Sequence, residues 1–312
     1  MSETREPQVG LLGLGSIGQH YCVNLLNRFP SVLVFDRDPG RLRAGAEMGA
    51  ERVASLGELG ERCDFVVVSL PNPAAVRQAL GGDQGLLASA RRGAIVVDTS
   101  TVSPEANIEM YEQARARGVG YLDAPVSGGE PLEAGVDGAK AASVTFMVGG
   151  DEHVFDKATP IFDALGKFWF HLGPAGSGSV VKLISNLCSG IQLLVAAEAF
   201  ALGAACGFSA ERLIEVFERT DARSYIMTDY VVPRLKRGDV EPGFSVDLQV
   251  KDHRLAEALA HDHTVPLPFN ALALQTWQRL RADGRGGRDI ADSSYFMTQQ
   301  INRELGRVGD RA

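Results

Sequence analysis

The stretch Gly13-Leu14-Gly15-Ser16-Ile17-Gly18 decides the fold, because it places three glycines in the pattern G-x-G-x-x-G. It follows the short apolar run Val9–Leu12 and opens the segment Ile17–Arg28, whose apolar residues recur with helical spacing. Such a turn between a strand and a helix is typical of dinucleotide binding. We expect the first glycine to permit the tight turn, the second to let a pyrophosphate approach, and the third to allow close packing. The amino end of the helix would then offer N–H groups to the phosphates.

Strand-like and helix-like segments alternate on either side of this turn through the first half of the chain. Because the apolar strand segments are unbroken, the alternation predicts an α/β fold of Rossmann type, with a doubly wound parallel sheet covered on both faces. The strand-like segments after the turn are Val32–Phe35, Phe65–Val68, Ile95–Val97, Val144–Val148 and Phe168–Phe170, and the clearest helical ones are Pro39–Met48 and Ser103–Arg117.

The second half is predicted to be all-helical. Ser179–Cys206 contains no proline and has room for one helix of roughly 28 residues. Further helical stretches follow at Ala210–Thr220, Ser224–Leu235, Leu248–Asp262 and Asn270–Asp283. We therefore predict a dinucleotide-binding domain over residues 1–173 and an all-helical substrate and oligomerisation domain over 174–312, joined by the long helix.

Composition excludes several classes of protein. The 312 residues carry a net charge of −8 with 22% charged and 45% hydrophobic residues, which is typical of a folded globular chain. An acidic balance argues against nucleic acid or an anionic membrane as partner. We expect no apolar run near the ~18 residues of a membrane span. The opening Met1–Glu6 lacks the apolar core of a signal peptide, which predicts a cytoplasmic protein, and the four cysteines without C-x-x-C spacing are expected to be free thiols.

Residues at the end of the second strand bear on the choice of dinucleotide. Asp36 can accept hydrogen bonds from both ribose hydroxyls of NAD and would repel the 2′-phosphate of NADP. Arg37 beside it could pair with that phosphate, so NADP stays open as the alternative to NAD.

Two further strand ends are expected to complete the dinucleotide site. In a doubly wound sheet the carboxyl ends of the strands line the ligand crevice. Leu70 and Pro71 follow one strong strand and Thr101 follows the next, so we expect these residues to contact the ribose and nicotinamide.

Four strings in this order resemble the β-hydroxyacid dehydrogenase family, which includes 3-hydroxyisobutyrate dehydrogenases and tartronate semialdehyde reductases. They are Gly13–Gly18, Asp123-Ala124-Pro125-Val126-Ser127-Gly128-Gly129, Gly176-Ser177-Gly178 leading to Lys182 and Asn186, and Lys251-Asp252. The likeness spans roughly residues 8–300, and the combination is more specific than any one piece.

The resemblance implies an enzyme that oxidises a small β-hydroxy acid, or reduces the matching semialdehyde, with NAD(P). Ser127, Gly128 and Gly129 would hold the substrate carboxylate. Lys182 would be the catalytic acid/base, with Asn186 orienting the substrate. Lys251 would lie near the nicotinamide side of the cofactor.

The residues around Lys182 support this role independently. Lys182 and Asn186 are four positions apart, so on a helix they share one face. They lie early in the long helix, where we expect the two domains to meet over the cofactor. The flanking residues are apolar, and desolvation disfavours the charged form of a lysine, which helps such a group to exchange protons.

The chain departs from the family pattern at two places. Glu130–Gly135 is inserted after the glycine pair and brings two acids beside the expected carboxylate site. His253 replaces the usual leucine after Lys251-Asp252. His253, His261 and His263 show no clear ligand set with a carboxylate, so we expect no metal site.

Other functions within and outside this family stay open. An imine reductase is one alternative, although members of that group tend to lack the lysine. A decarboxylating 6-phosphogluconate dehydrogenase is a much longer chain and usually has histidine where Ser185 stands. A catalytically inactive NAD(P)-binding protein is the alternative from another class. The long helix is apolar over much of its circumference, which favours a homodimer or homotetramer.

Overall fold

The computed structural model describes residues 6–128, 135–237 and 242–301. The chain divides into two compact units, Met1–Lys182 and Leu183–Ala312. The division falls inside a long helix, whereas the sequence placed the domain boundary at residue 173, just before that helix. The boundary at 173 stays a prediction.

Unit 1 is built on a mostly parallel sheet, as the sequence predicted. Its strands follow one another in the order β3-β2-β1-β4-β5-β6-β8-β7, and β9 pairs with β8 on its other side. The bounds are β1 Val9–Leu12, β2 Val32–Phe35, β3 Glu51–Arg52, β4 Phe65–Val68, β5 Ile95–Asp98, β6 Gly120–Asp123, β7 Val126–Ser127, β8 Val144–Gly150 and β9 Gly166–His171.

The sheet departs from parallel order at one side, where β8 runs antiparallel to β6 and β7. Only Ala124 and Pro125 separate β6 from β7, so β7 continues in the direction of β6. The chain then returns along both as β8 after the short helix α7 (Gly135–Lys140). A parallel neighbour would need a crossover connection of a dozen or more residues, which helix α8 (Glu152–Leu165) provides between β8 and β9.

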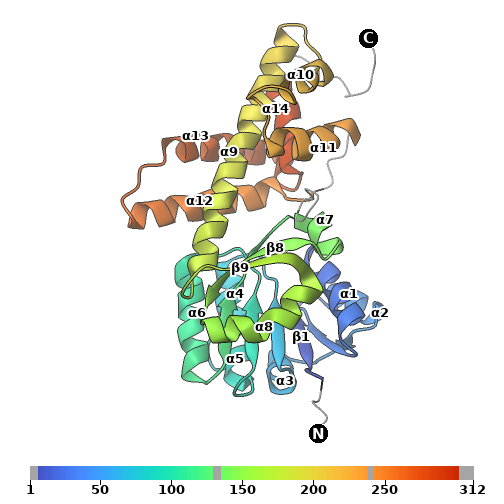
Figure 1. Cartoon of the computed structure of the whole chain (residues 1–312), viewed down its shortest axis with the longest axis vertical. Helices are drawn as coiled ribbons and strands as arrows, with labels where there is room; N and C mark the ends of the chain where they lie inside the picture. The colour runs from blue at the N-terminus through green and yellow to red at the C-terminus, as the bar shows by residue number, and fades with distance from the viewer. Residues whose placement is uncertain (1–5, 129–134, 238–241, 302–312) are drawn as a thin grey trace. The chain divides into compact units, whose positions relative to one another are not determined.

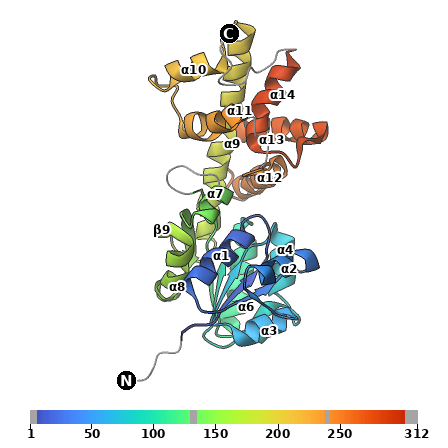
Figure 2. The same cartoon turned by 90° about the vertical axis from the view of Figure 1, so that its right-hand side faces the viewer.

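Helices cover both faces of this sheet (Figures 1 and 2). Successive side chains of a strand point to opposite faces, so each strand contributes to two cores. Leu11 and Val67 pack in one core with Tyr21 of α1, and Leu12 and Val68 pack in the other with residues of α3 to α6. The helices not yet bounded are α1 Gly18–Arg28, α2 Pro39–Glu47, α3 Leu56–Arg62, α4 Pro73–Leu80, α5 Leu86–Ser89 and α6 Pro104–Ala116.

Helix α6 shows why these segments begin where they do. Ser103 is its N-cap, and its hydroxyl accepts a hydrogen bond from the backbone N–H of Ala106. Pro104 occupies the first helical position, where its missing N–H costs no hydrogen bond.

In the described part of unit 2 the regular elements are all helices, and one isolated bridge joins Ser245 to Asp289. Helix α9 (Ser177–Ala205) is 29 residues long, and it begins in unit 1 and continues into unit 2. Helices α12 and α13 lie side by side (Figure 1). The remaining elements are α10 Ala210–Phe217, η1 Ile226–Val231, α11 Val232–Arg237, α12 Val246–Asp262, α13 Pro268–Leu280, η2 Arg281–Arg285, η3 Ile290–Asp292 and α14 Ser293–Gln300.

Helix α9 is long and apolar enough to cross a membrane, judged by length and composition alone, with a mean hydropathy of 1.7 in its most apolar window. The expectation that no apolar run reaches this length is therefore wrong. The same test is passed by core helices of soluble proteins, and 44% of that window is buried inside this protein. The helix is thus weak evidence for a membrane.

Candidate functional site

The glycine turn joins β1 to α1 with the geometry that its pattern predicts. Gly13 has a φ of +97°, and a Cβ there would lie 2.3 Å from the carbonyl oxygen of Ser69. A Cβ at Gly18 would lie 2.0 Å from the carbonyl oxygen of Gly13. Gly15 is different, because its Cβ would meet only Arg41 Nη1, at 4.0 Å. The first and third glycines are thus required by packing, and the second leaves open space.

The amino end of α1 is suited to an anion. No side chain caps this helix end. The uncapped N–H groups and the helix dipole favour negative charge, as a pyrophosphate would supply. The residues present therefore fit a dinucleotide.

Asp36 lies at the carboxyl end of β2, beside this turn, and is 9% exposed. Its Oδ2 accepts a hydrogen bond from the N–H of Leu14 at 2.7 Å, and its Oδ1 accepts one from the N–H of Asp38 at 2.8 Å. The carboxylate thus fixes the loop, and its remaining lone pairs can accept from ribose hydroxyls. Arg37 is exposed next to it.

The loops after β4 and β5 are tied to each other at the same edge of the sheet. The N–H of Leu70 donates to the hydroxyl of Ser100 at 2.9 Å, and the Thr99 hydroxyl donates to the carbonyl of Val68 at 2.7 Å. Leu70 and Thr101 are half-buried, and Pro71 is exposed. Since β1, β4 and β5 are parallel, these loops lie at the edge that also carries the glycine turn.

The expected carboxylate cradle is only partly described. Ser127 ends β7, and Ser127 and Gly128 are half-buried. Gly129 and residues 130–134 of the insertion lie outside the described residues.

Lys182 is buried near the beginning of α9, with 6% of its surface exposed. It is the last residue of unit 1, the unit that carries the glycine turn. The start of α9 is held at the carboxyl end of β6, because Asp123 accepts hydrogen bonds from the N–H groups of Gly176 at 2.7 Å and Ser179 at 2.9 Å. The lysine therefore follows, by one helical turn, a segment bound to the ligand edge of the sheet.

Asn186 and Lys251 belong to unit 2, where one carboxylate connects them. The Asn186 side-chain amide donates to Asp252 Oδ2 at 2.5 Å, and Lys251 Nζ lies 3.0 Å from Asp252 Oδ1. Asn186 and Asp252 are both buried. Asp252 thus orients the side-chain amide of Asn186 and forms an ion pair with the ammonium of Lys251, the two residues that the sequence singled out.

Sequence reasoning missed a buried polar cluster at the ends of β5 and β6. Burial raises the pKa of Asp98 to about 6 and that of Asp123 to about 7, although hydrogen bonds donated by O–H and N–H groups to Asp98, and by N–H groups to Asp123, oppose the two shifts. The Tyr121 hydroxyl lies 2.9 Å from Asp98 Oδ2 and 2.6 Å from Asn107 Oδ1. An acidic residue closing each of two apolar strands was the signal that could have pointed to it.

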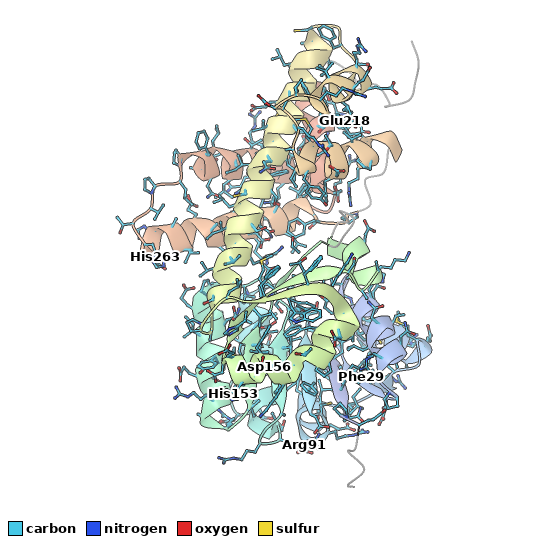
Figure 3. The ribbon with its side chains drawn as sticks, viewed as in Figure 1. Phe29, Arg91, His153, Asp156, Glu218 and His263 are labelled. Atoms are coloured by element: carbon cyan, nitrogen blue, oxygen red, sulfur yellow. The ribbon has the colours of Figure 1, made fainter. Side chains whose placement is uncertain are left out.

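The histidines take no part in a metal cluster in the described ranges, where no group of three or more His, Cys, Asp or Glu side chains could hold a metal ion. His263 lies at the far end of α12, exposed at the turn towards α13 (Figure 3). His253 is fully buried, and its Nδ1 lies 2.6 Å from Asn270 Oδ1. Burial lowers the pKa of His253, so it is held neutral.

A Rossmann unit with this glycine turn, followed by a helical unit, is the architecture of oxidoreductases that use a nicotinamide dinucleotide. Residues 8–173 match the family model described as the NAD-binding domain of 6-phosphogluconate dehydrogenase. Residues 176–294 match the model described as NAD-binding of NADP-dependent 3-hydroxyisobutyrate dehydrogenase. The chain belongs to the β-hydroxyacid dehydrogenase family.

The similarity to individual relatives extends over almost the whole chain. The chain is 35% identical to 2-(hydroxymethyl)glutarate dehydrogenase of Eubacterium barkeri, over 91% of this chain and 92% of that one. It is 33% identical to NAD-dependent L-serine dehydrogenase of Pseudomonas aeruginosa, over 91% and 95%. Its fold matches Mycobacterium tuberculosis 3-hydroxyisobutyrate dehydrogenase, solved with L-serine, with a TM-score of 0.84 and 30% identity over 93% of this chain and 99% of that one.

Proposed function

We propose that this chain interconverts a small β-hydroxy acid and its semialdehyde, with Lys182 as the general acid/base. The observation that carries the proposal is the position of Lys182. It is buried, and it lies one helical turn beyond Ser179, whose N–H is bound to Asp123 at the carboxyl edge of the sheet. The glycine turn lies at that same edge.

The chemistry of the proposed site follows from this arrangement. The glycine turn and Asp36 would hold a nicotinamide dinucleotide, which would supply hydride transfer to or from the carbon that bears the reacting oxygen. Lys182 takes the hydroxyl proton during oxidation and gives it back to the carbonyl oxygen during reduction. As an ammonium it also stabilises negative charge on that oxygen. Asn186, held by Asp252, orients the oxygen.

The substrate class is supported by the chemistry in the names of the relatives. 2-(Hydroxymethyl)glutarate, L-serine and 3-hydroxyisobutyrate each carry a hydroxyl on the carbon β to a carboxylate. Ser127 and Gly128 would bind that carboxylate through a hydroxyl and backbone N–H groups. We propose NAD as the preferred cofactor, because the Asp36 carboxylate would repel a 2′-phosphate.

The test is a turnover assay with the purified chain. NADH formation is followed by absorbance with L-serine, 3-hydroxyisobutyrate, 2-(hydroxymethyl)glutarate and D-glycerate, and lactate serves as the control with its hydroxyl at the α carbon. We expect oxidation of at least one β-hydroxy acid and none of lactate. A second assay follows NAD(P)H consumption with a cyclic imine, and activity there without any oxidation of a hydroxy acid would instead indicate an imine reductase. NADH binding without any turnover would indicate an inactive dinucleotide-binding protein.

We also propose a homodimer or homotetramer. Helix α9 exposes large apolar side chains along its length, including Ile184 at 53%, Val195 at 57% and Leu202 at 67%. Exposed apolar residues along one helix favour burial against another chain. Sedimentation equilibrium tests this proposal, and a mass of 33.4 kDa at all concentrations contradicts it.

A further inference from the structure

Two buried side chains of unit 1, Asp123 and Asn107, hold the beginning of α9 through three hydrogen bonds. Asp123 closes β6 and has no exposed surface. Its two carboxylate oxygens accept hydrogen bonds from Gly176 N–H and Ser179 N–H, which flank the beginning of the helix. A carboxylate at this position satisfies two of the N–H groups that a helix leaves unpaired, and its charge is stabilised by the helix dipole.

Two glycines make room for this carboxylate. A Cβ at Gly149 would lie 2.5 Å from Asp123 Oδ1. A Cβ at Gly178 would lie 2.7 Å from the Asp123 carbonyl oxygen and 2.9 Å from Asp123 Oδ2. The carboxylate is therefore enclosed tightly by β8 on one side and by the helix on the other.

A second tie reaches the same turn through a side chain. The Asn107 amide of α6 donates to the Ser179 hydroxyl at 2.6 Å, and both residues are buried. Asn107 Oδ1 is in turn 2.6 Å from the Tyr121 hydroxyl, which lies 2.9 Å from Asp98 at the end of β5. One residue of α9, Ser179, is thus held by its N–H from β6 and by its hydroxyl from α6.

Lys182 follows Ser179 by three residues, so the two lie on adjacent turns of one helix face. We propose that Asp123 is a positioning residue for Lys182, fixing the first turn of α9 through the N–H groups of Gly176 and Ser179, with Asn107 fixing it through the Ser179 hydroxyl. This inference rests on the proposed function in that it assigns the lysine the role of acid/base. A helix turn that is free to shift moves the ammonium relative to the reacting oxygen, and misplacement by about 1 Å can cost roughly 100-fold in rate.

The position of Lys182 should then depend on the charge of Asp123. Burial raises the pKa of Asp123 to about 7. The groups that face it are the N–H donors of α9, Asp98 from β5, whose charge raises this pKa further, and Tyr121 from its own strand. The ionised carboxylate accepts both N–H bonds strongly, and protonation weakens them.

The test compares Asp123→Asn with Asp151→Asn. An asparagine keeps the shape but presents an NH₂ group to one of the two N–H donors. We expect a kcat reduced roughly 10- to 100-fold with an NADH Kd within about twofold of wild type. The ratio of wild-type to variant kcat should grow between about pH 6 and pH 8, as the wild-type carboxylate ionises. Asp151 precedes α8, a helix without the lysine, and accepts a hydrogen bond from Tyr111, so its variant should keep wild-type kcat.

A second readout does not need turnover. Reductive ¹³C-methylation labels the six lysines, and the Lys182 signal is assigned by its loss in Lys182→Arg. We expect its chemical shift to change in Asp123→Asn and to stay unchanged in Asp151→Asn. If the wild type oxidises no hydroxy acid, the proposed function fails. The change in the Lys182 chemical shift then decides by itself whether Asp123 positions Lys182.

A second variant, which removes only the hydrogen bond between Asn107 and the Ser179 hydroxyl, keeps the proposal testable if the first variant does not fold. If Asp123→Asn does not fold, Ser179→Ala keeps the backbone N–H and loses the hydroxyl, so kcat should fall several-fold and the Lys182 signal should move. An unchanged Lys182 signal in every folded variant of this pair overturns the proposal, as does an unchanged kcat where the wild type is active.

Discussion

Asn186 Nδ2 and Asp252 Oδ2 lie 2.5 Å apart in a buried hydrogen bond that joins α9 to α12. This hydrogen bond fixes the orientation of the Asn186 side-chain amide, and therefore the direction in which its Oδ1 points. The Gln249 side-chain amide also donates to the backbone carbonyl oxygen of Asn186 at 3.3 Å. Both contacts keep this part of α9 in register with α12, so the substrate-orienting role proposed for Asn186 depends on a neighbour 66 positions away.

The variant Asp252→Asn tests that dependence. It removes the charge that accepts from Asn186 and pairs with Lys251. We expect kcat to fall about tenfold with NADH affinity nearly unchanged, because a charge-assisted hydrogen bond contributes ~1.5–3 kcal/mol. Steady-state kinetics and NADH fluorescence titration measure the two effects. Asp262→Asn, at the exposed end of the same helix, is the control, and an equal kcat in both variants speaks against the role of Asp252.

Lys182→Ala should abolish turnover while NADH still binds. General acid/base catalysis contributes roughly 10²- to 10⁴-fold, and the alanine cannot exchange the proton. The measurements are single-turnover rates and an NADH titration. Lys157→Ala, on the exposed face of α8, should behave as the wild type. A parallel loss of turnover and NADH binding would show that Lys182 serves packing or cofactor binding instead.

Gly18→Ala should reduce stability, whereas Gly15→Ala should reduce NADH affinity. An added Cβ at Gly18 meets the Gly13 carbonyl, so we expect a loss of roughly 1–3 kcal/mol or more in the free energy of unfolding. At Gly15 the space is open, so stability should change by no more than ~0.5 kcal/mol. NADH affinity should nevertheless drop, because the methyl group occupies the approach of the pyrophosphate. Urea unfolding and NADH titration separate the two cases, and full NADH affinity in Gly15→Ala contradicts the proposed phosphate site.

Asp36→Asn should move cofactor preference towards NADP. The amide keeps the side-chain shape but no longer repels a 2′-phosphate, and Arg37 is exposed beside it. We expect the ratio of kcat/KM for NADP over NAD to rise about tenfold, equivalent to ~1.4 kcal/mol. Glu47→Gln, at the other end of α2, is the matched control. An unaltered ratio would place the choice of cofactor in other residues.

Asp98 should make stability fall as pH rises. Burial raises the pKa of Asp98 from 3.8 to about 6. A group with a raised pKa in the folded state stabilises the protein fully below its unfolded pKa, and this contribution is lost as pH rises through the folded pKa. The shift corresponds to about 3 kcal/mol between about pH 4 and pH 6. The hydrogen bonds around Asp98 favour its protonated form. The Tyr121 hydroxyl lies beside both Asp98 Oδ2 and Asn107 Oδ1 but has one proton to donate, so a proton on Asp98 allows the second hydrogen bond to form.

The comparison with Asp98→Asn removes this contribution while leaving distant titrating groups unchanged. Urea unfolding at successive pH values should show the stability of the variant rising relative to wild type across that window. Asp156→Asn, at an exposed position of α8 (Figure 3), should instead differ from wild type by a constant amount. Parallel curves for Asp98→Asn and wild type would refute the raised pKa.

The sequence alone was enough for the features that depend on near neighbours in the chain. The glycine turn, the strands Val9–Leu12, Val32–Phe35 and Phe65–Val68, and the long helix all follow from glycine spacing, apolar runs and the absence of proline. The N-cap at Ser103 was predictable for the same reason, because the cap and the N–H that it binds are three residues apart. The short strands β3 and β7, of two residues each, have no such signature and were missed.

Only the tertiary structure decided which polar groups meet. Asp123 binds an N–H group 53 positions later, and Asn107 binds a hydroxyl 72 positions later. The reversal of β8 is of the same kind, since strand direction depends on how the chain returns to the sheet. No local pattern encodes these pairings, because a buried hydrogen bond is selected by the packing around both partners, and that packing exists only once the distant segments have come together.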